Sequence, residues 1–190
     1  HTDILVVTDK ALKELGLAER ALAPFADAGV NLHWYAGVDP DPTFAHVTEG
    51  AEVLRAAGCT AIVAVGGGSS MDAAKIIACT RTSDDSPDKW VGLNKVPDDV
   101  LPIYAIPTTS GTGSEATMGA VIKDPEEKLK HIIVGEDLLP QAVALDPDLL
   151  LGLPAPVTAA TGIDALTHGI EAYICIWDRG TRKENGRIAI

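Results

Sequence analysis

A run of apolar residues leads directly into three glycines, and this junction constrains the fold more than any other feature of the sequence. Residues Ala61–Val65 are apolar throughout, which is typical of a strand buried on both faces. Gly66, Gly67 and Gly68 follow, and a helical pattern begins near Ser70. A buried strand that turns tightly into a helix is half of a β-α-β unit, so the junction indicates a parallel sheet with helices on its faces.

The rest of the chain repeats this alternation. We expect strands at residues 4–8, 31–36, 61–65, 101–106 and 142–145, a short hairpin at 118–123 with 130–134, and helices at 11–28, 44–57 and 71–79. Residues 80–99 are predicted to be a polar loop. From Asp148 onward the pattern is helical, so we place a domain boundary near residue 150. In open sheets of this kind, ligands bind outside the carboxyl ends of the strands.

Composition and charge exclude several classes of function. The chain has 46% hydrophobic and only 4% aromatic residues, which indicates a mostly aliphatic core. No apolar run approaches the roughly 18 residues of a membrane span, so we expect no membrane partner. A net charge of −12 argues against nucleic acid, because no Lys/Arg stripe is present to displace counterions. Cys59, Cys79 and Cys175 have no metal-like spacing and are interpreted as small buried side chains in a reducing, cytoplasmic compartment.

The glycine junction itself has two readings. Three glycines let the backbone turn sharply and approach a ligand, and the following helix start offers free N–H groups and a positive dipole end to an anion such as a phosphate. The other reading is a tight strand-to-helix turn, with Ser70 as the helix N-cap and Asp72 stabilising the first turn. The glycines alone do not decide between them.

Two further segments at the same edge of the sheet favour a nucleotide. Pro107-Thr-Thr-Ser-Gly-Thr-Gly-Ser-Glu115 follows the fourth strand and holds more hydroxyl groups than a turn requires. Asp9 follows the first strand, where an acidic side chain can accept hydrogen bonds from an adenosine ribose and would repel a 2′-phosphate, which favours NAD over NADP. Asp9 is equally well placed to be the N-cap of the next helix.

A carboxylate and an imidazole lie four residues apart in the C-terminal helical stretch. On a helix, Asp164 and His168 share one face and can converge on a divalent metal such as Zn or Fe(II), with further ligands from elsewhere. A hydrogen-bonded surface pair has the same spacing, so this signal is weak without the glycine junction.

Taken together, five segments resemble the iron-dependent (group III) alcohol dehydrogenases. The segments are VTDKAL, GVDPDPT, VGGGSSMDAAK, IPTTSGTGSEAT and TAATGIDALTHGIEAYI, and they run in order from about residue 4 to residue 174. The resemblance implies an α/β fold: a Rossmann-like parallel-sheet, dinucleotide-binding domain over residues 1–149, then the first part of an all-helical metal-binding domain over 150–190. On this reading both ends of the chain are cut edges of something larger.

The resemblance also implies roles for individual residues. Those expected to bind NAD are Asp9, Asp41, Gly67, Gly68, Ser69, Thr108, Thr109, Thr112, Thr117 and Lys130. Asp164 and His168 match the first two of four metal ligands, with Fe(2+) as the family metal and Zn(2+) as the alternative. The implied reaction is hydride transfer between NAD and a small-molecule alcohol or aldehyde, in a cytoplasmic homo-oligomer that is expected to be a dimer.

Two departures from the family pattern stand out. Asp41 replaces the usual Asn and adds a negative charge beside the cofactor, and the histidines that supply the other two metal ligands in the family have no match in this sequence. This chain alone is therefore not expected to hold a catalytic metal tightly. The alternatives are a non-catalytic nucleotide-binding fragment and a related reductase, such as one resembling maleylacetate reductase.

Overall fold

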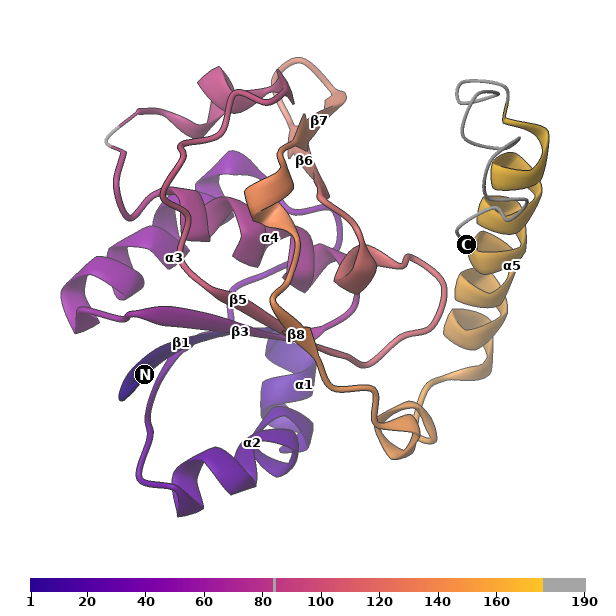
Figure 1. Ribbon diagram of the computed structural model, residues 1–190. Coiled ribbons are helices and arrows are strands. Elements are labelled where there is room, and N and C mark those ends of the chain that lie inside the picture. Colours follow the sequence, from indigo (N-terminus) through magenta and orange to yellow (C-terminus); the bar gives the residue numbers. More distant parts are fainter. Residues whose placement is uncertain (84, 176–190) are drawn as a thin grey trace, which may run out of the picture.

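The computed structural model describes residues 1–83 and 85–175 of the chain. None of the helices in these residues is both long and apolar enough to cross a membrane. Figure 1 shows a layered α/β body, from which one long helix stands apart near the end of the described chain.

The main sheet is parallel and has five strands, in the order β2-β1-β3-β5-β8. They are β1 (Asp3–Val7), β2 (Asn31–Tyr35), β3 (Ala61–Gly66), β5 (Ile103–Pro107) and β8 (Ala142–Val143). From β1 the chain continues to β2 on one side, and from β3 it continues to β5 on the other side, so the topological switch point lies between β1 and β3. In doubly wound folds, a crevice opens at the carboxyl ends of the strands at this point.

Helices cover both faces of the main sheet, which explains why β1 after Asp3 and β3 before Gly66 are apolar throughout. Alternate side chains of β1 enter two separate cores: Leu5 and Val7 pack with α3 (Phe44–Ala57) and α4 (Gly68–Cys79), whereas Ile4 and Val6 face α2 (Leu17–Asp27). Every residue of β3 is buried. This matches the predicted parallel sheet buried on both faces.

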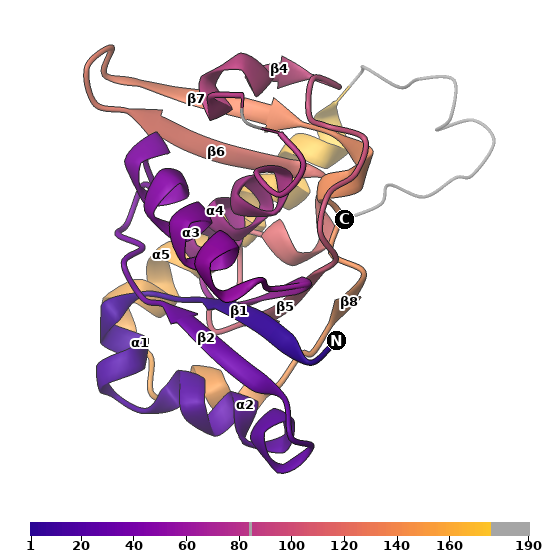
Figure 2. The same cartoon turned by 90° about the vertical axis from the view of Figure 1, so that its left-hand side faces the viewer.

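A second, smaller sheet forms a further layer. It contains β4 (Gly92–Leu93) and the antiparallel hairpin of β6 (Gly119–Asp124) and β7 (Leu129–Val134). Figure 2 shows α3 and α4 between the main sheet and this hairpin, and α4 contacts both β3 and β6. The helix α4 is therefore buried on nearly all sides.

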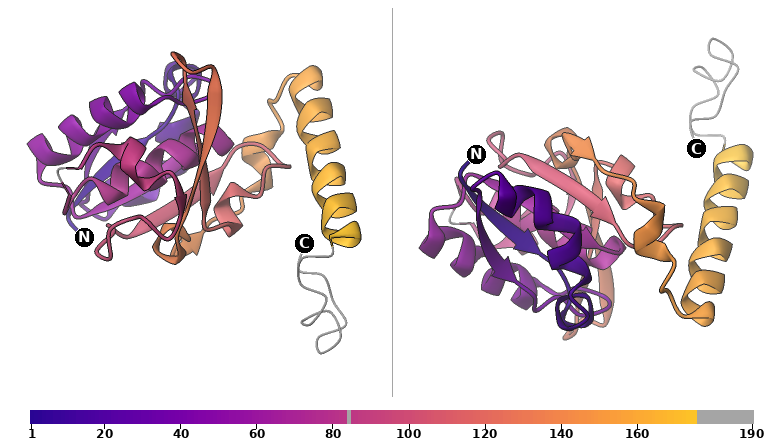
Figure 3. Two further views of the ribbon diagram at one scale, coloured as in Figure 1. Left: turned by 90° about the horizontal axis from the view of Figure 1, so that it is seen from above. Right: turned by 90° about the horizontal axis from the view of Figure 1, so that it is seen from below.

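The helix α5 (Ala155–Ile174) carries the Asp164 and His168 pair and lies beside the body rather than on it. None of its residues is buried within the described part of the chain, although Ile163, Leu166 and Ile170 are apolar and more than half exposed. Figure 3 shows from two further directions that α5 extends along one side of the rest of the described chain. The predicted boundary near residue 150 falls in the short segment η4 (Pro147–Leu150) before α5, and it stays a prediction.

Most predicted elements are present, with four corrections. The expected helix 11–28 is two helices, α1 (Lys10–Glu14) and α2, because Gly16 adopts a left-handed φ of 66° between them. The predicted polar loop contains the short helix η1 (Pro87–Trp90), whose Trp90 is buried in the core, and the strand β4. The predicted last strand is shorter, and Cys175 is exposed rather than buried.

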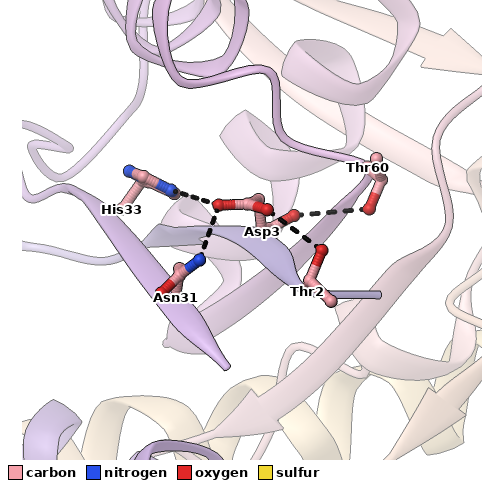
Figure 4. A network of polar contacts seen from close by, with 5 residues as sticks. All are labelled: Thr2, Asp3, Asn31, His33 and Thr60. Carbon is pink, nitrogen blue, oxygen red and sulfur yellow. Dashed lines mark hydrogen bonds and ion pairs between the residues drawn. The ribbon is translucent and has the colours of Figure 1, made fainter. Parts of the chain in front are cut away.

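A polar network joins the amino ends of three neighbouring strands, at the edge opposite the glycine junction (Figure 4). The Asp3 carboxylate accepts hydrogen bonds from Asn31 Nδ2 at 3.0 Å and from the Thr2 hydroxyl at 3.0 Å, and His33 Nε2 lies 3.1 Å away. The Thr60 hydroxyl donates to the Asp3 carbonyl at 3.4 Å. The hydrogen bonds from His33, Asn31 and Thr2 lower the pKa of Asp3, and the bonds between strands fix the register of β1 against its neighbours.

Candidate functional site

One cavity of about 530 Å³ gathers most of the predicted site residues. Its walls come from the start of α4, the segment 112–121, the hairpin β6–β7, the turn at residues 41–42 and one face of α5. We call this cavity the cleft. The predicted residues that line it are Asp41, Gly68, Ser69, Thr112, Thr117, Lys130, Asp164 and His168.

The start of α4 offers an anion site. The helix begins at Gly68, with Gly67 as an extended N-cap and no side-chain cap, so the predicted capping role of Ser70 is wrong. Ser70 is instead buried within the first turn, and its Oγ occupies the place that a Cβ on Gly66 would need, at 2.4 Å. The uncapped N–H groups of the first turn and the helix dipole favour a bound phosphate.

The hydroxyl-rich loop lies against the glycines. A Cβ on Gly67 would be 3.1 Å from Thr109 Oγ1, and one on Gly68 would be 3.0 Å from the Thr112 methyl group. The Thr109 Oγ1 atom is buried and has no hydrogen-bond partner in the described chain. Thr108 is buried, and its N–H donates to the Gly66 carbonyl at 2.9 Å. We call the surface formed by Gly67, Gly68, Thr109 and Thr112 the cradle. It is narrow and contains a hydroxyl without a hydrogen-bond partner among the described residues, so it fits a ligand that presents phosphate or ribose oxygens.

The same loop touches α5. Gly111 has a φ of 137°, and a Cβ there would lie 2.1 Å from the Thr161 carbonyl oxygen. Only glycine permits this approach. The loop therefore connects the glycine cradle to the helix that carries the candidate metal ligands.

Asp164 and His168 face the cleft, one turn apart on α5. His168 Nε2 lies 3.6 Å from Asp164 Oδ1, and both side chains are about half exposed. One carboxylate and one imidazole fit the donor set of Fe(II) or Zn, but they make an incomplete coordination shell. Among the residues that the structure describes, the only group of three or more metal-binding side chains is Asp124, Glu127 and His131 in the hairpin, not the pair on α5.

Asp41 has a left-handed φ of 59°, which Asp tolerates better than most residues. Its carboxylate lies 2.6 Å from Lys130 Nζ and 3.7 Å from Lys123 Nζ, and the Lys130 hydrogen bond lowers the pKa of Asp41. The charge that Asp41 adds at this position is therefore offset by two lysines on the hairpin.

Asp9 lies outside the cleft lining. One of its oxygens accepts a hydrogen bond from the Leu12 N–H at 2.8 Å, so Asp9 is the N-cap of α1. The neighbouring Thr8 hydroxyl is fully buried and lacks a partner among the described residues. Both residues follow β1 at the switch point, next to the glycine junction that follows β3. The capping reading is confirmed, and the ribose-binding role of Asp9 stays a prediction.

Three residues were not predicted to have a role at the cleft: Asp72 and Ser114, which line it, and Lys75, which lies behind its wall. Lys75 is fully buried, and its ammonium nitrogen contacts oxygens of Ser114, Thr117 and Gly119. Burial lowers the pKa of Lys75 to about 8, against the attraction of Asp72 and Glu115. Burial also raises the pKa of Asp72. The signal was available, because Lys75 is the only charged residue in the otherwise apolar stretch 73–79.

Comparisons with known proteins agree with this geometry. The family model described as iron-containing alcohol dehydrogenase matches residues 1–147. The chain is 41% identical over 170 residues to an NAD-dependent methanol dehydrogenase from Bacillus methanolicus, covering 90% of this chain and 45% of that protein. It is 39% identical over 172 residues to a lactaldehyde reductase from Escherichia coli strain K12, covering 90% of this chain and 45% of that protein.

Solved structures give the same result. A sulfoacetaldehyde reductase from Bifidobacterium kashiwanohense, solved in complex with NAD+, superposes with a TM-score of 0.83 at 37% identity, covering 91% of this chain and 46% of that one. A 1,3-propanediol oxidoreductase gives a TM-score of 0.87 at 40% identity, covering 91% and 45%. The chain thus spans about half the length of the relatives it matches. On the family match, the sequence identity and the shared fold, the chain belongs to the iron-containing alcohol dehydrogenase family.

Proposed function

We propose that this chain is the NAD-binding part of a metal-assisted alcohol dehydrogenase or aldehyde reductase, together with its first two metal ligands. The observation that carries the proposal is the shared cleft, in which the uncapped start of α4 and the Asp164–His168 pair line one cavity. Redox transfer between a nicotinamide and a metal-activated substrate needs both sites within reach of one another.

The cradle around Gly67 and Gly68 supports NAD as the cofactor. The diphosphate would accept hydrogen bonds from the first N–H groups of α4, and the Thr109 hydroxyl would gain the partner that it lacks in the described chain. Lys130 lines the cleft and could reach a ribose oxygen once it leaves Asp41. The acidic Asp9 near the switch point disfavours a 2′-phosphate, and therefore NADP.

The pair on α5 supports a divalent metal, with Fe(2+) as the family expectation and Zn(2+) as the alternative. When bound, such a metal would supply Lewis-acid polarisation of the substrate oxygen. Asp164 and His168 would hold it from one side, and two further ligands must come from outside the described residues. The Gly111 contact with Thr161 would set the distance between this helix and the cofactor loop.

The substrate class is a small alcohol or aldehyde. The printed names of similar proteins include methanol dehydrogenase, 1,3-propanediol dehydrogenase and lactaldehyde reductase, all with short substrates. We further propose that the protein acts in the cytoplasm as a homo-oligomer, that residues 1–149 form the cofactor domain, and that residues 150–190 begin a helical one.

Calorimetry and turnover assays test the proposal. NAD is titrated into the 190-residue chain, with NADP as the control; tighter binding of NAD is expected. The full-length natural protein, loaded with Fe(II) or Zn, is then assayed for NADH formation with a series of primary alcohols. NAD binding without turnover of any alcohol or aldehyde would identify a nucleotide-binding module instead. Absence of NAD binding would overturn the proposal.

A further inference from the structure

A fully buried lysine and a carboxylate on α4 hold the neighbouring wall of the cleft. Lys75 Nζ lies 2.7 Å from the Ser114 carbonyl oxygen, 3.0 Å from that of Thr117 and 2.7 Å from that of Gly119. It also lies 3.1 Å from the Ser114 hydroxyl and 3.2 Å from the Thr117 hydroxyl. An ammonium group has three donor hydrogens and no acceptor, so three carbonyl oxygens match it.

Asp72 completes the arrangement one turn earlier on the same face of α4. Its Oδ1 accepts a hydrogen bond from the Ser114 hydroxyl at 2.7 Å, and its Oδ2 accepts one from the Val121 N–H at 3.0 Å. The Ser114 hydroxyl donates its single hydrogen to Asp72, so its oxygen faces Lys75 as an acceptor and shares one ammonium hydrogen with a carbonyl oxygen. We call Lys75, Asp72 and Ser114 the clamp.

The clamp joins two walls of the cleft by hydrogen bonds from side chains of α4. One wall is the start of α4, with Gly68 and Ser69; the other is the segment 112–121. Gly119–Val121 belong to β6 and pair with β7, but residues 112–118 contain only the three-residue helix η2 (Ser114–Ala116), so regular structure fixes few of their backbone groups. Lys75 itself is fully buried and does not line the cleft, so it cannot touch a ligand there.

We propose that Lys75 is a positioning residue for cofactor binding: through Ser114, Thr117 and Gly119 it fixes the segment 112–121 against the start of α4, so that both walls are ordered before the cofactor arrives. This inference rests on the proposed function, because it assumes that the cleft binds NAD. Ordering a binding wall in advance removes its entropy cost from the binding step. Without the clamp, this cost reappears as a weaker affinity for NAD.

Binding and hydrogen exchange of the full chain test the proposal. Lys75→Met keeps the apolar stem and removes the ammonium group. We expect its Kd for NAD to rise at least tenfold, about the factor that ordering one backbone residue represents. Amide exchange of Ser114, Thr117 and Val121 is expected to accelerate, while that of β1 and β3 does not change. The same result is expected of Lys75→Gln, which replaces Lys75→Met if that variant does not fold.

The matched control is Ile77→Val on the same helix. The Ile77 side chain is fully buried and lies beside Gly50 of α3, and it forms no hydrogen bond to the segment 112–121. It should lower the unfolding temperature and leave the Kd for NAD unchanged, because a merely structural defect does not reach the cleft. If the parent chain binds NAD and Lys75→Met binds it equally well at a temperature where both are folded, the positioning role is wrong while the proposed function stands. If the parent chain binds no NAD, both are wrong.

Discussion

The contact between Gly111 and Thr161 gives a direct way to move the candidate metal ligands. In Gly111→Ala, the new Cβ would lie 2.1 Å from the Thr161 carbonyl oxygen, and restoring an ordinary contact of 3.4 Å requires a displacement of 1.3 Å. The loop is held by the Thr108–Gly66 hydrogen bond and by the Lys75 contacts to Ser114, whereas α5 has no buried residue in the described chain. We therefore expect α5, rather than the loop, to be displaced in Gly111→Ala.

This displacement has a calculable consequence for activity. Asp164 lies three residues beyond Thr161 on α5, so a shift of about 1 Å would move the candidate metal ligands relative to the proposed cofactor site. A misplacement of about 1 Å can reduce a catalysed rate about 100-fold. In the full-length natural protein we expect kcat for alcohol oxidation to fall by about that factor, with the Kd for NAD unchanged. NADH formation and calorimetry measure the two quantities.

Gly113→Ala is the matched control in the same loop. Gly113 has a left-handed φ of 63°, and nothing lies within 4 Å of its ideal Cβ, so the substitution adds backbone strain of about 1–2 kcal/mol without a collision. It should reduce the unfolding free energy and leave kcat unchanged. If Gly111→Ala retains the parent kcat, or loses kcat and NAD affinity equally, α5 is not the element that yields and the reasoning fails.

Three further substitutions test other parts of the structure. Asp41→Asn keeps a residue that tolerates the left-handed φ and removes the charge paired with Lys130, so the affinity for NAD, measured by calorimetry, should rise severalfold. The loss of these exposed ion pairs should lower the unfolding free energy by less than about 1 kcal/mol. A weaker affinity for NAD contradicts this prediction. His168→Ala in the full-length natural protein should reduce bound metal, measured by atomic absorption, to background without changing NAD binding; retained metal would show that Asp164 and His168 are not ligands. Because the pKa of Asp3 is lowered in the folded state, its ionised carboxylate stabilises the fold above the ordinary carboxyl pKa of 3.8, and this contribution disappears as pH falls through the lower folded pKa. Asp3→Asn should therefore make the unfolding free energy less steeply dependent on pH in the acid range. An unchanged pH dependence, measured by circular dichroism, would refute this prediction.

Elements whose ends carry local signals were predictable from sequence. Helix α3 begins after Thr43, whose N–H donates a hydrogen bond to His46 Nδ1 at 3.1 Å, and it ends before Gly58, which has a left-handed φ of 63°, so its bounds match the prediction. The parallel sheet was predictable because continuous apolar runs of strand length alternate along the chain with helical segments. The start of α4 was misplaced because Ser70 is a common N-cap residue, whereas its side chain is buried against Gly66 in this fold.

The polar contacts between distant segments were not predictable in the same way. Lys75 and Asp72 are three residues apart, as in many exposed helical ion pairs, and only the fold shows that a hairpin covers this face. Likewise, the pairing of Asp41 with Lys130 joins residues 89 positions apart. The family resemblance placed Asp41 and Lys130 beside the cofactor, but it did not imply that the two would neutralise each other.

The thickness of α4 sets the spacing between the layers on either side of it. Ala73, Ala74, Ala78 and Cys79 are fully buried on this helix, which has the main sheet on one side and the hairpin on the other. Small side chains let both neighbours approach closely, and a larger residue at any of these positions would have to push one of them outward. Substitutions that change side-chain volume in α4 should therefore alter the affinity of the proposed cofactor site as readily as substitutions of residues that line the cleft.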